Sequence, residues 1–239
     1  MPWQVWLLIF VLGWSAWAWM SRMIMRNPVG DPVSGIAYRF VRIYTALVHR
    51  LRVTGKENIP TSRCPGSLLV VCNHTAGIDP LLVQAACPFY VQWMMARDMM
   101  WSGLADIWDY FDLIFVDREK PDTAALREAV RSVRSGRVVG IFPEGKIERP
   151  QGQLLPFQQG VGAIVSLSGV QVLPILIRGT PAASSAWSSL WQTSRSELIV
   201  GEIMHFKRGV PPETVISRLE SWFLSQGLTR EGSGETQSA

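Results

Sequence analysis

The chain has 239 residues, a formal net charge of +4 and 48% hydrophobic residues. This modest positive charge suits an anionic membrane surface and anionic substrates. No tract of Lys and Arg of the kind that binds nucleic acid occurs, which argues against that class of partner. Cys64, Cys72 and Cys87 form neither a close pair nor a zinc-ligand spacing. We therefore expect reduced thiols in a cytoplasmic protein.

The N-terminal segment, residues 3–20, is apolar except for Gln4 and Ser15. As a helix it would be about 27 Å long, close to the thickness of a bilayer core, and its tryptophans suit the two interfaces. A cleaved signal peptide is the alternative, but no Lys or Arg precedes the apolar run. The arginines that follow place the body of the chain on the cytoplasmic side, at the inner membrane if the source is bacterial. They are Arg22, Arg26, Arg39, Arg42, Arg50 and Arg52.

The next segment predicts an amphipathic helix. Either its apolar face covers the protein core, or it lies among anionic headgroups. If both N-terminal segments bend back, the first need not span the bilayer and the protein would be monotopic. The apolar face holds Ile36, Phe40, Ile43, Leu47 and Leu51, and the polar face holds Tyr38, Arg42, Thr45, His49 and Arg52.

From residue 56 onward, strand patterns alternate with helix patterns. Continuous Leu, Val and Ile runs predict an α/β fold with a mostly parallel sheet covered by helices on both faces. We expect N-terminal membrane-anchoring helices over residues 1–55, one catalytic domain over 56–228 and a disordered tail over 229–239. The predicted strands are 67–72, 89–95, 113–117, 137–142, 172–177 and 198–204, and the predicted helices are 80–86, 122–135, 160–168 and 212–225.

An imidazole and a carboxylate, His74 and Asp79, stand where the strand 67–72 should end. Four residues separate them, so on one continuous helix they would point about 140° apart. They must meet across a turn, which Gly77 permits. Such a pair can move a proton near pH 7, with the carboxylate orienting the ring. Alternatively, Asp79 before Pro80 only caps a helix, and His74 is a histidine satisfied in a loop.

Three later strands carry further blocks. One delivers Arg118, the next runs into Phe142-Pro143-Glu144-Gly145, and the last contains Pro174. In this order and spacing, over about residues 67–177, the blocks resemble the glycerolipid acyltransferase family, which includes lysophosphatidic acid acyltransferases. That family carries an Asn-His-x-x-x-x-Asp block, a strand ending in Arg, a Phe-Pro-Glu-Gly block and a Pro-containing strand.

The resemblance implies a glycerol-3-phosphate acyltransferase-like fold and a membrane-bound O-acyltransferase. Its acyl thioester, carried by coenzyme A or acyl carrier protein, would be attacked by the hydroxyl of a lysophospholipid, most simply lysophosphatidic acid. His74 would be the general base and Asp79 would orient it. Arg118 would hold the acceptor phosphate, and Glu144 and Gly145 would contact the acceptor. No cofactor and no metal are implied, because a thiolate leaves readily.

The chain departs from the family pattern after Gly145, where many members continue Thr-Arg. Here Lys146 or Arg149 would supply the positive charge, although a lysine does not reproduce bidentate phosphate binding. Another acceptor, such as a lyso-ornithine lipid, therefore stays open. So do an acyl-thioester hydrolase and a non-catalytic lipid-binding protein. Residues 140–146 match the Gly-x-x-x-x-Gly-Lys part of the phosphate-binding loop of nucleotide-hydrolysing proteins, but Ile147 replaces the Ser or Thr that would bind magnesium, which argues against that class. No Gly-x-Ser-x-Gly sequence occurs, which argues against a serine hydrolase.

Overall fold

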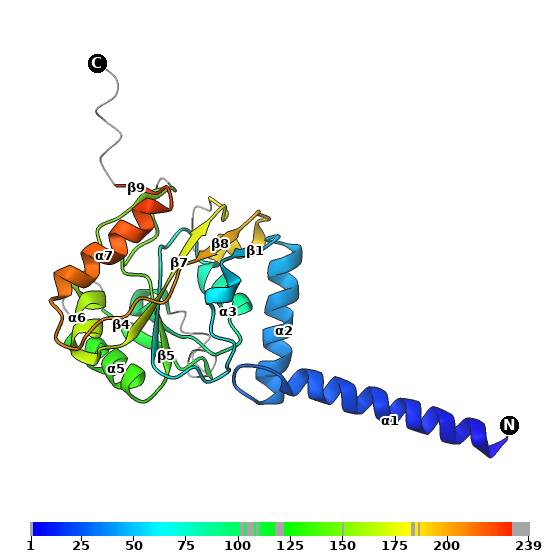
Figure 1. Cartoon of the computed structure of the whole chain (residues 1–239). Coiled ribbons are helices and arrows are strands. Elements are labelled where there is room, and N and C mark those ends of the chain that lie inside the picture. Colours follow the sequence, from blue (N-terminus) through cyan, green and yellow to red (C-terminus); the bar gives the residue numbers. More distant parts are fainter. Residues whose placement is uncertain are drawn as a thin grey trace.

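The computed structural model describes residues 2–100, 103, 108, 110–117, 122–149, 151–182, 185 and 187–230. Their central feature is a seven-stranded sheet in the order β1-β8-β7-β2-β5-β3-β4, with helices on both faces (Figure 1). The predicted α/β class is confirmed. The strands are β1 (Arg52–Thr54), β2 (Leu68–Cys72), β3 (Gln92–Ala96), β4 (Ile114–Val116), β5 (Val138–Ile141), β7 (Gln171–Arg178) and β8 (Glu197–Val200).

All four helices predicted after residue 56 are present, with bounds close to the predicted ones. They are α3 (Asp79–Ala86), α5 (Thr123–Arg134), α6 (Gln159–Ser168) and α7 (Pro212–Ser225). Two more helices precede the sheet, α1 (Trp3–Met25) and α2 (Pro32–Leu47), and short 3-10 turns lie at Lys56–Asn58, Arg97–Met99 and Trp187–Trp191.

Parallel pairing brings several strand ends to one edge of the sheet. β2 pairs in parallel with both β5 and β7, and β3 pairs in parallel with β5 and β4. β7 and β8 are antiparallel, whereas β1 runs parallel to β8. The carboxyl ends of β2, β3, β4, β5 and β7 therefore face the same way, which is where ligands bind in open α/β sheets.

The sequence of β2 is continuously apolar because this strand is buried on both faces of the sheet. Leu69 and Val71 belong to one buried cluster with residues of α5, α6 and α7. Leu68, Val70 and Cys72 belong to a second cluster with residues of α3, on the opposite face. All five residues of β2 are buried. Successive side chains of a strand point to opposite faces, so a strand covered on both sides needs an apolar residue at every position.

Three predicted boundaries differ clearly from the structure, and the first is the start of β3, which lies at Gln92 instead of residue 89. β8 ends at Val200 instead of continuing to residue 204. The Gly201 N–H still donates to the Pro174 carbonyl at 2.9 Å, but Pro174 has no N–H with which to return the bond, and the regular β7–β8 ladder stops there. At the C-terminus, Thr229–Arg230 form β9, which pairs with β6 (Gln153–Leu154). The first two residues of the predicted disordered tail therefore lie in a strand, and residues 231–239 lie outside the described part.

Helix α2 packs its small and polar residues against the protein and exposes its apolar face, the reverse of an ordinary surface helix. Its buried residues are small or polar, Ser34, Gly35 and Thr45, and the Tyr38 hydroxyl donates to the Cys87 carbonyl after α3 at 2.9 Å. The apolar side chains of α2 are exposed: Val33, Ile36, Phe40, Ile43 and Leu47 are each at least 60% exposed. The interpretation in which this apolar stripe covers the core is wrong.

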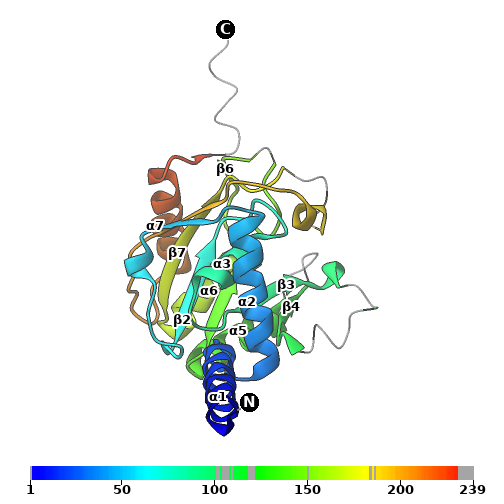
Figure 2. The ribbon, with the colours of Figure 1, turned by 90° about the vertical axis from the view of Figure 1, so that its right-hand side faces the viewer.

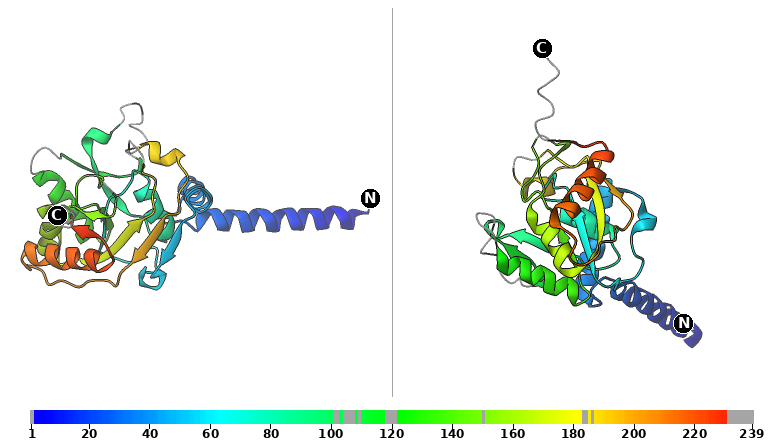
Figure 3. Two further views of the ribbon diagram at one scale, coloured as in Figure 1. Left: turned by 90° about the horizontal axis from the view of Figure 1, so that it is seen from above. Right: turned by 60° about the vertical axis from the view of Figure 1, so that its left-hand side comes forward.

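Helix α2 is also shorter than predicted, and α1 is longer. α2 ends at Leu47, so Leu51 and Arg52 lie beyond the helix and Arg52 begins β1. α1 continues to Met25 and has no buried residue. It projects away from the sheet, as Figures 1 and 3 show, and is seen nearly end-on in Figure 2. By length and composition it is apolar enough to cross a membrane.

Candidate active site

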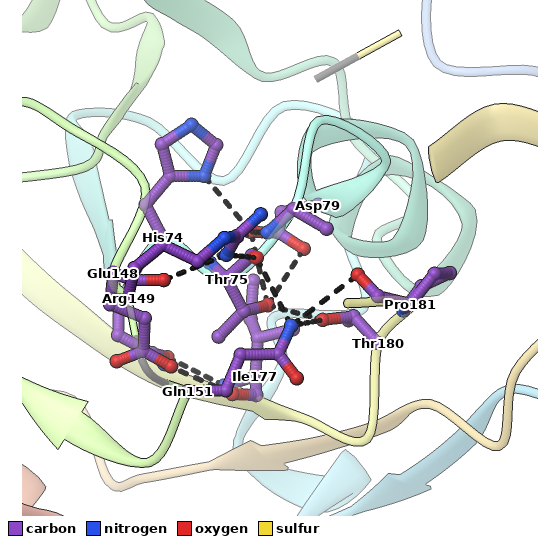
Figure 4. Close-up of polar contacts among 11 residues, drawn as sticks. His74, Thr75, Asp79, Glu148, Arg149, Gln151, Ile177, Thr180 and Pro181 are labelled. Carbon is purple, nitrogen blue, oxygen red and sulfur yellow. Dashed lines mark hydrogen bonds and ion pairs between the residues drawn. The ribbon is translucent and has the colours of Figure 1, made fainter. Parts of the chain in front are cut away.

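His74 and Asp79 meet across the turn that joins β2 to α3. The Nδ1 atom of His74 lies 2.9 Å from Oδ2 of Asp79. The Asp79 side chain is fully buried, whereas that of His74 is 19% exposed. A carboxylate only accepts hydrogen bonds, so Nδ1 carries the proton and Nε2 keeps its lone pair. Nε2 points away from Asp79 in Figure 4. The ring is thus arranged to act as a base.

The Asp79 carboxylate faces back into this turn. Its Oδ2 accepts hydrogen bonds from the N–H groups of Thr75 at 2.6 Å and Ala76 at 2.9 Å. Its Oδ1 accepts the Thr75 hydroxyl at 3.1 Å. Asp79 is itself the first residue of α3, and no side chain caps that helix. The interpretation of Asp79 as a mere helix cap is therefore wrong, because its hydrogen bonds go to the turn and to His74.

Stacked aromatic rings fix the plane of the imidazole. His74 stacks on Phe142 with ring centroids 4.2 Å apart, and Phe142 stacks on Trp93 at 4.8 Å. The rings come from the ends of β2 and β5 and from β3, which are neighbours in the sheet. Gly140 of β5 makes room for this stack, because a Cβ there would lie 2.6 Å from the Trp93 ring. Ring stacking and the Asp79 hydrogen bond together leave His74 little freedom to rotate.

Asn73 ties the start of the turn to the neighbouring strand. Its Nδ2 donates to the Ile177 carbonyl at 3.0 Å, and its Oδ1 accepts the Ile177 N–H at 2.7 Å. Asn73 is fully buried. The side-chain amide thus replaces a ladder partner for β7 where β2 has ended. The turn that carries His74 is held to the sheet on this side.

Two buried glutamates follow β5. Glu144 is 2% exposed and Glu148 is 1% exposed. Within the described part of the chain, the carboxyl oxygens of Glu144 make no well-aligned hydrogen bond, although the backbone N–H groups of His74 and Leu155 lie close enough to favour the charged form. Burial, together with the nearby Glu148 charge, raises the pKa of Glu144 to about 9. Burial also raises the pKa of Glu148 to about 7. Near neutral pH, Glu144 is therefore an uncharged acid that can donate a hydrogen bond to a bound group.

We expect the free energy of unfolding to fall as the pH rises, because Glu144 holds its proton more tightly in the folded state. The effect extends from the ordinary glutamate pKa of 4.5 toward about 9. One such group contributes at most about 1.4 kcal/mol per pH unit. The contribution of Glu148 ends near pH 7, where its own folded-state pKa lies. The free energy of unfolding, measured by urea unfolding between about pH 7 and 8.5, therefore reports the contribution of Glu144 apart from that of Glu148.

The Glu144→Gln variant should show a much flatter pH dependence over this interval. The Glu202→Gln variant serves as a control at an exposed glutamate. If wild type and Glu144→Gln lose stability equally, Glu144 does not carry a raised pKa in the folded protein.

The predicted basic residues lie in different environments. Nη1 of Arg149 donates to the carbonyls of Thr75 at 2.9 Å and Glu148 at 2.7 Å. Lys146 is exposed. Gly145 has a φ of 69°, a left-handed conformation that favours glycine. Arg118 lies outside the described residues, immediately after Asp117 beyond the end of β4. Arg149 thus ties the loop after β5 to the His74 turn.

Several site residues are absent from the sequence-based prediction. Phe142 and Thr75 lie within two residues of predicted site residues in the chain, and this closeness in sequence is the signal that could have identified them. Trp93 lies in the predicted strand 89–95 and is buried at 7% exposure, and its ring also supports Phe142. Thr180 follows β7 and donates its hydroxyl hydrogen bond to Thr75 at 2.7 Å. Nothing in the sequence pattern distinguished Thr180.

The fold and the site together define an α/β protein with a hydrogen-bonded His-Asp pair at the carboxyl edge of its sheet. Residues 50–178, more than half of the chain, match the model of the acyltransferase family. The chain belongs to this acyltransferase family. The family predicted from the ordered blocks is confirmed.

Curated relatives and a solved structure agree with this assignment. A 1-acyl-sn-glycerol-3-phosphate acyltransferase of Bacillus subtilis is 22% identical over 69% of this chain and 79% of its own length. The enzyme of the same name from Borreliella burgdorferi is 32% identical over 55% of this chain, which matches about half (52%) of that protein. The crystal structure of the 1-acyl-sn-glycerophosphate acyltransferase PlsC from Thermotoga maritima has a TM-score of 0.60 at 23% identity. It covers 80% of this chain and 78% of that one, and it shows the shared fold.

Proposed function

We propose that this acyltransferase moves a fatty acyl group from an acyl thioester to the free hydroxyl of a lysophospholipid, most simply lysophosphatidic acid. The thioester would be carried by coenzyme A or acyl carrier protein. The observation that carries the proposal is the His74 Nδ1 hydrogen bond to buried Asp79, which leaves Nε2 as a base. The relatives from Bacillus subtilis and Borreliella burgdorferi are named for a phosphorylated monoacylglycerol acceptor.

In the proposed reaction, Nε2 of His74 takes the proton of the acceptor hydroxyl as its oxygen attacks the thioester carbonyl. Asp79 stabilises the imidazolium that forms. The C–S bond then breaks, the new C–O ester bond remains, and the departing thiolate takes the proton from His74. The mechanism needs no cofactor and no metal, because a thiolate is a good leaving group.

The developing oxyanion needs hydrogen-bond donors. The N–H groups of Thr75 and Ala76 already donate to Asp79. Among the described residues, the N–H groups of Gly77 and Ile78 have no acceptor in the turn. We propose these two amides as the donors.

An acyl-transfer assay with the purified protein tests the function. Labelled acyl-coenzyme A is supplied with lysophosphatidic acid, with a lyso-ornithine lipid or with no acceptor. Product formation that depends on lysophosphatidic acid supports the proposal. Thioester cleavage without acceptor would identify a hydrolase, transfer to the lyso-ornithine lipid would reassign the acceptor, and no reaction would fit a lipid-binding protein.

The proposed phosphate site consists of Arg118 and Lys146. Replacing either with alanine should raise KM for lysophosphatidic acid, since a charge-assisted phosphate contact is worth roughly 10- to 150-fold in affinity. KM for the acyl donor should stay unchanged. Initial rates are compared for lysophosphatidic acid and for an uncharged monoacylglycerol.

Arg149→Ala supplies the comparison for this experiment. Arg149 also binds the carbonyls of Thr75 and Glu148, so its removal should lower the rate with both acceptors. Equal losses with both acceptors in the Arg118 and Lys146 variants would show that these residues do not bind phosphate, and would favour a different lyso-lipid.

We also propose that α1 and α2 hold the protein on a membrane. α1 has no buried residue, and the apolar face of α2 points away from the protein. Burying such a face among lipid chains removes apolar surface from water. Arg22 and Arg26 at the end of α1 favour the cytoplasmic side for the folded body. Labelling of the exposed Cys64 thiol by an impermeant reagent, in vesicles of known orientation, tests this sidedness.

The apolar face of α2 should bind lipid without α1. A chain lacking residues 1–21 should retain partial, salt-sensitive association with anionic liposomes. In that shortened chain, Phe40→Glu should lower the partition coefficient onto liposomes at least about tenfold, since a buried aromatic side chain contributes roughly 1.5–3 kcal/mol. Liposome flotation measures the effect.

The matched control is Leu167→Glu. Leu167 is an exposed leucine on α6, on the other side of the sheet from α2 (Figure 1). It should leave flotation unchanged. If Phe40→Glu and Leu167→Glu float equally, the α2 face is not a lipid contact.

A further inference from the structure

A chain of buried hydroxyl groups connects Asp79 to the loop after β7. Oγ1 of Thr180 lies 2.7 Å from Oγ1 of Thr75, which lies 3.1 Å from Oδ1 of Asp79. Thr75 is 2% exposed and Thr180 is 6% exposed, so bulk water does not compete for these bonds. Figure 4 shows the three side chains and the neighbouring Gln151. Thr180 touches neither the imidazole nor the carboxylate directly.

Gln151 determines the direction of these hydrogen bonds. Its Nε2 lies 3.2 Å from the Thr75 carbonyl, 3.4 Å from the Pro181 carbonyl and 3.2 Å from the Thr180 hydroxyl. Carbonyl oxygens only accept, so the amide NH₂ must face them, and it therefore also donates to the Thr180 oxygen. The Thr180 hydroxyl then donates its hydrogen bond to the Thr75 oxygen. The Thr75 hydroxyl in turn donates to the Asp79 carboxylate.

The Thr75 hydroxyl matters because the two oxygens of Asp79 are held differently. Oδ2 accepts from His74 Nδ1, from the Thr75 N–H, from the Ala76 N–H and, at a longer 3.3 Å, from the Thr75 hydroxyl. Among the described residues, the short hydrogen bond to Oδ1 comes from the Thr75 hydroxyl. Hydrogen bonds to both oxygens fix the plane of a carboxylate, whereas hydrogen bonds to one oxygen leave the group freer to turn about its Cβ–Cγ bond. The plane of the carboxylate sets the direction in which His74 is aligned.

We propose that Thr180 is a positioning residue, which acts through the Thr75 hydroxyl to fix the plane of the Asp79 carboxylate against His74. The consequence for catalysis rests on the proposed function, but the alignment of the ring does not. Without the Thr180 hydroxyl, Thr75 loses the donor that directs its own proton, and the bond to Oδ1 weakens. A carboxylate with fewer donors is more basic, which favours imidazolium over neutral imidazole. The His74 ring should then take up a proton at higher pH.

Other titratable groups also face Asp79 and His74, and their influence on the His74 titration has to be separated from that of Thr180. Asp79 faces the Cys72 thiol of β2 and the carboxyls of Glu144 and Glu148 after β5. Arg149 binds the Thr75 carbonyl. Helix α3 carries no titratable residue besides Asp79. Of these neighbours Glu148 titrates near neutral pH, so each measurement is repeated with Glu148→Gln.

The experiment is an NMR titration of the histidine rings in the full-length protein in detergent. The chain has three histidines, and the His74 signal is the one that His74→Ala removes. In Thr180→Val, which keeps the shape but not the hydroxyl, the midpoint of the His74 titration should move up by about half a pH unit. Thr180→Ser should titrate like wild type. No substrate is present, so this result stands apart from success or failure of the acyl-transfer assay.

The activity readout follows the same pattern. Thr180→Val should lower kcat roughly 2- to 12-fold, the range of one hydrogen bond, with KM little changed, and Thr180→Ser should restore it. An unmoved His74 titration in folded Thr180→Val would overturn the proposal, as would a Thr180→Ser variant that behaves like Thr180→Val. Should Thr180→Val not fold, Thr180→Ala is titrated in its place under the same criteria.

Discussion

Replacing His74 with alanine should lower turnover by about 10²- to 10⁴-fold, the usual contribution of a general base. In the proposed reaction, Nε2 is the group that receives the proton of the acceptor hydroxyl. Ring stacking on Phe142 and the Asp79 hydrogen bond already hold the imidazole in place. The loss should therefore appear in kcat, measured with saturating acyl-coenzyme A and lysophosphatidic acid.

The fold should survive this substitution, because the His74 side chain is partly exposed. Thermal unfolding checks the fold, and His205→Ala provides a control at an exposed histidine. Folded His74→Ala protein with unchanged turnover would remove the general-base mechanism. A loss of similar size in His205→Ala would show that the assay responds to something other than proton transfer.

Asp79→Asn should cost as much activity, up to about 10⁴-fold in kcat, as removal of the charge behind a catalytic histidine does elsewhere. The asparagine oxygen can take the place of Oδ2 and keep the hydrogen bonds from the Thr75 and Ala76 N–H groups. The fold should therefore persist. The negative charge that stabilises the imidazolium is lost, and kcat should fall while KM changes little.

The comparison with Asp31→Asn makes this prediction specific. Asp31 caps α2 by accepting the Ser34 N–H at 2.9 Å, and asparagine caps a helix nearly as well as aspartate does. Asp31→Asn should therefore keep full activity. Full activity in Asp79→Asn would show that Asp79 only supports the turn, and that His74 works without a charged partner.

The sequence was sufficient for six of the seven strands of the sheet and for the pair His74 and Asp79, whereas β1 (Arg52–Thr54) was not predicted. β2 and β5 are apolar throughout, and β7 is apolar and buried between its exposed ends Gln171 and Arg178, so the runs are visible without a structure. Blocks that follow such strands must gather at one edge of a parallel sheet. For the same reason His74 and Glu144, far apart in the chain, could be assigned to one site together with Asp79.

Tertiary structure decided which way each face and each carboxylate points. The period of α2 separates its apolar and polar sides, but only packing shows that Thr45 is buried and Phe40 is exposed. The sequence allowed Asp79 to cap α3, and the fold instead turns its carboxylate to His74. Thr180 reaches Thr75 because β7 lies beside β2. Local periodicity contains no information on such contacts, since they depend on how distant strands pair.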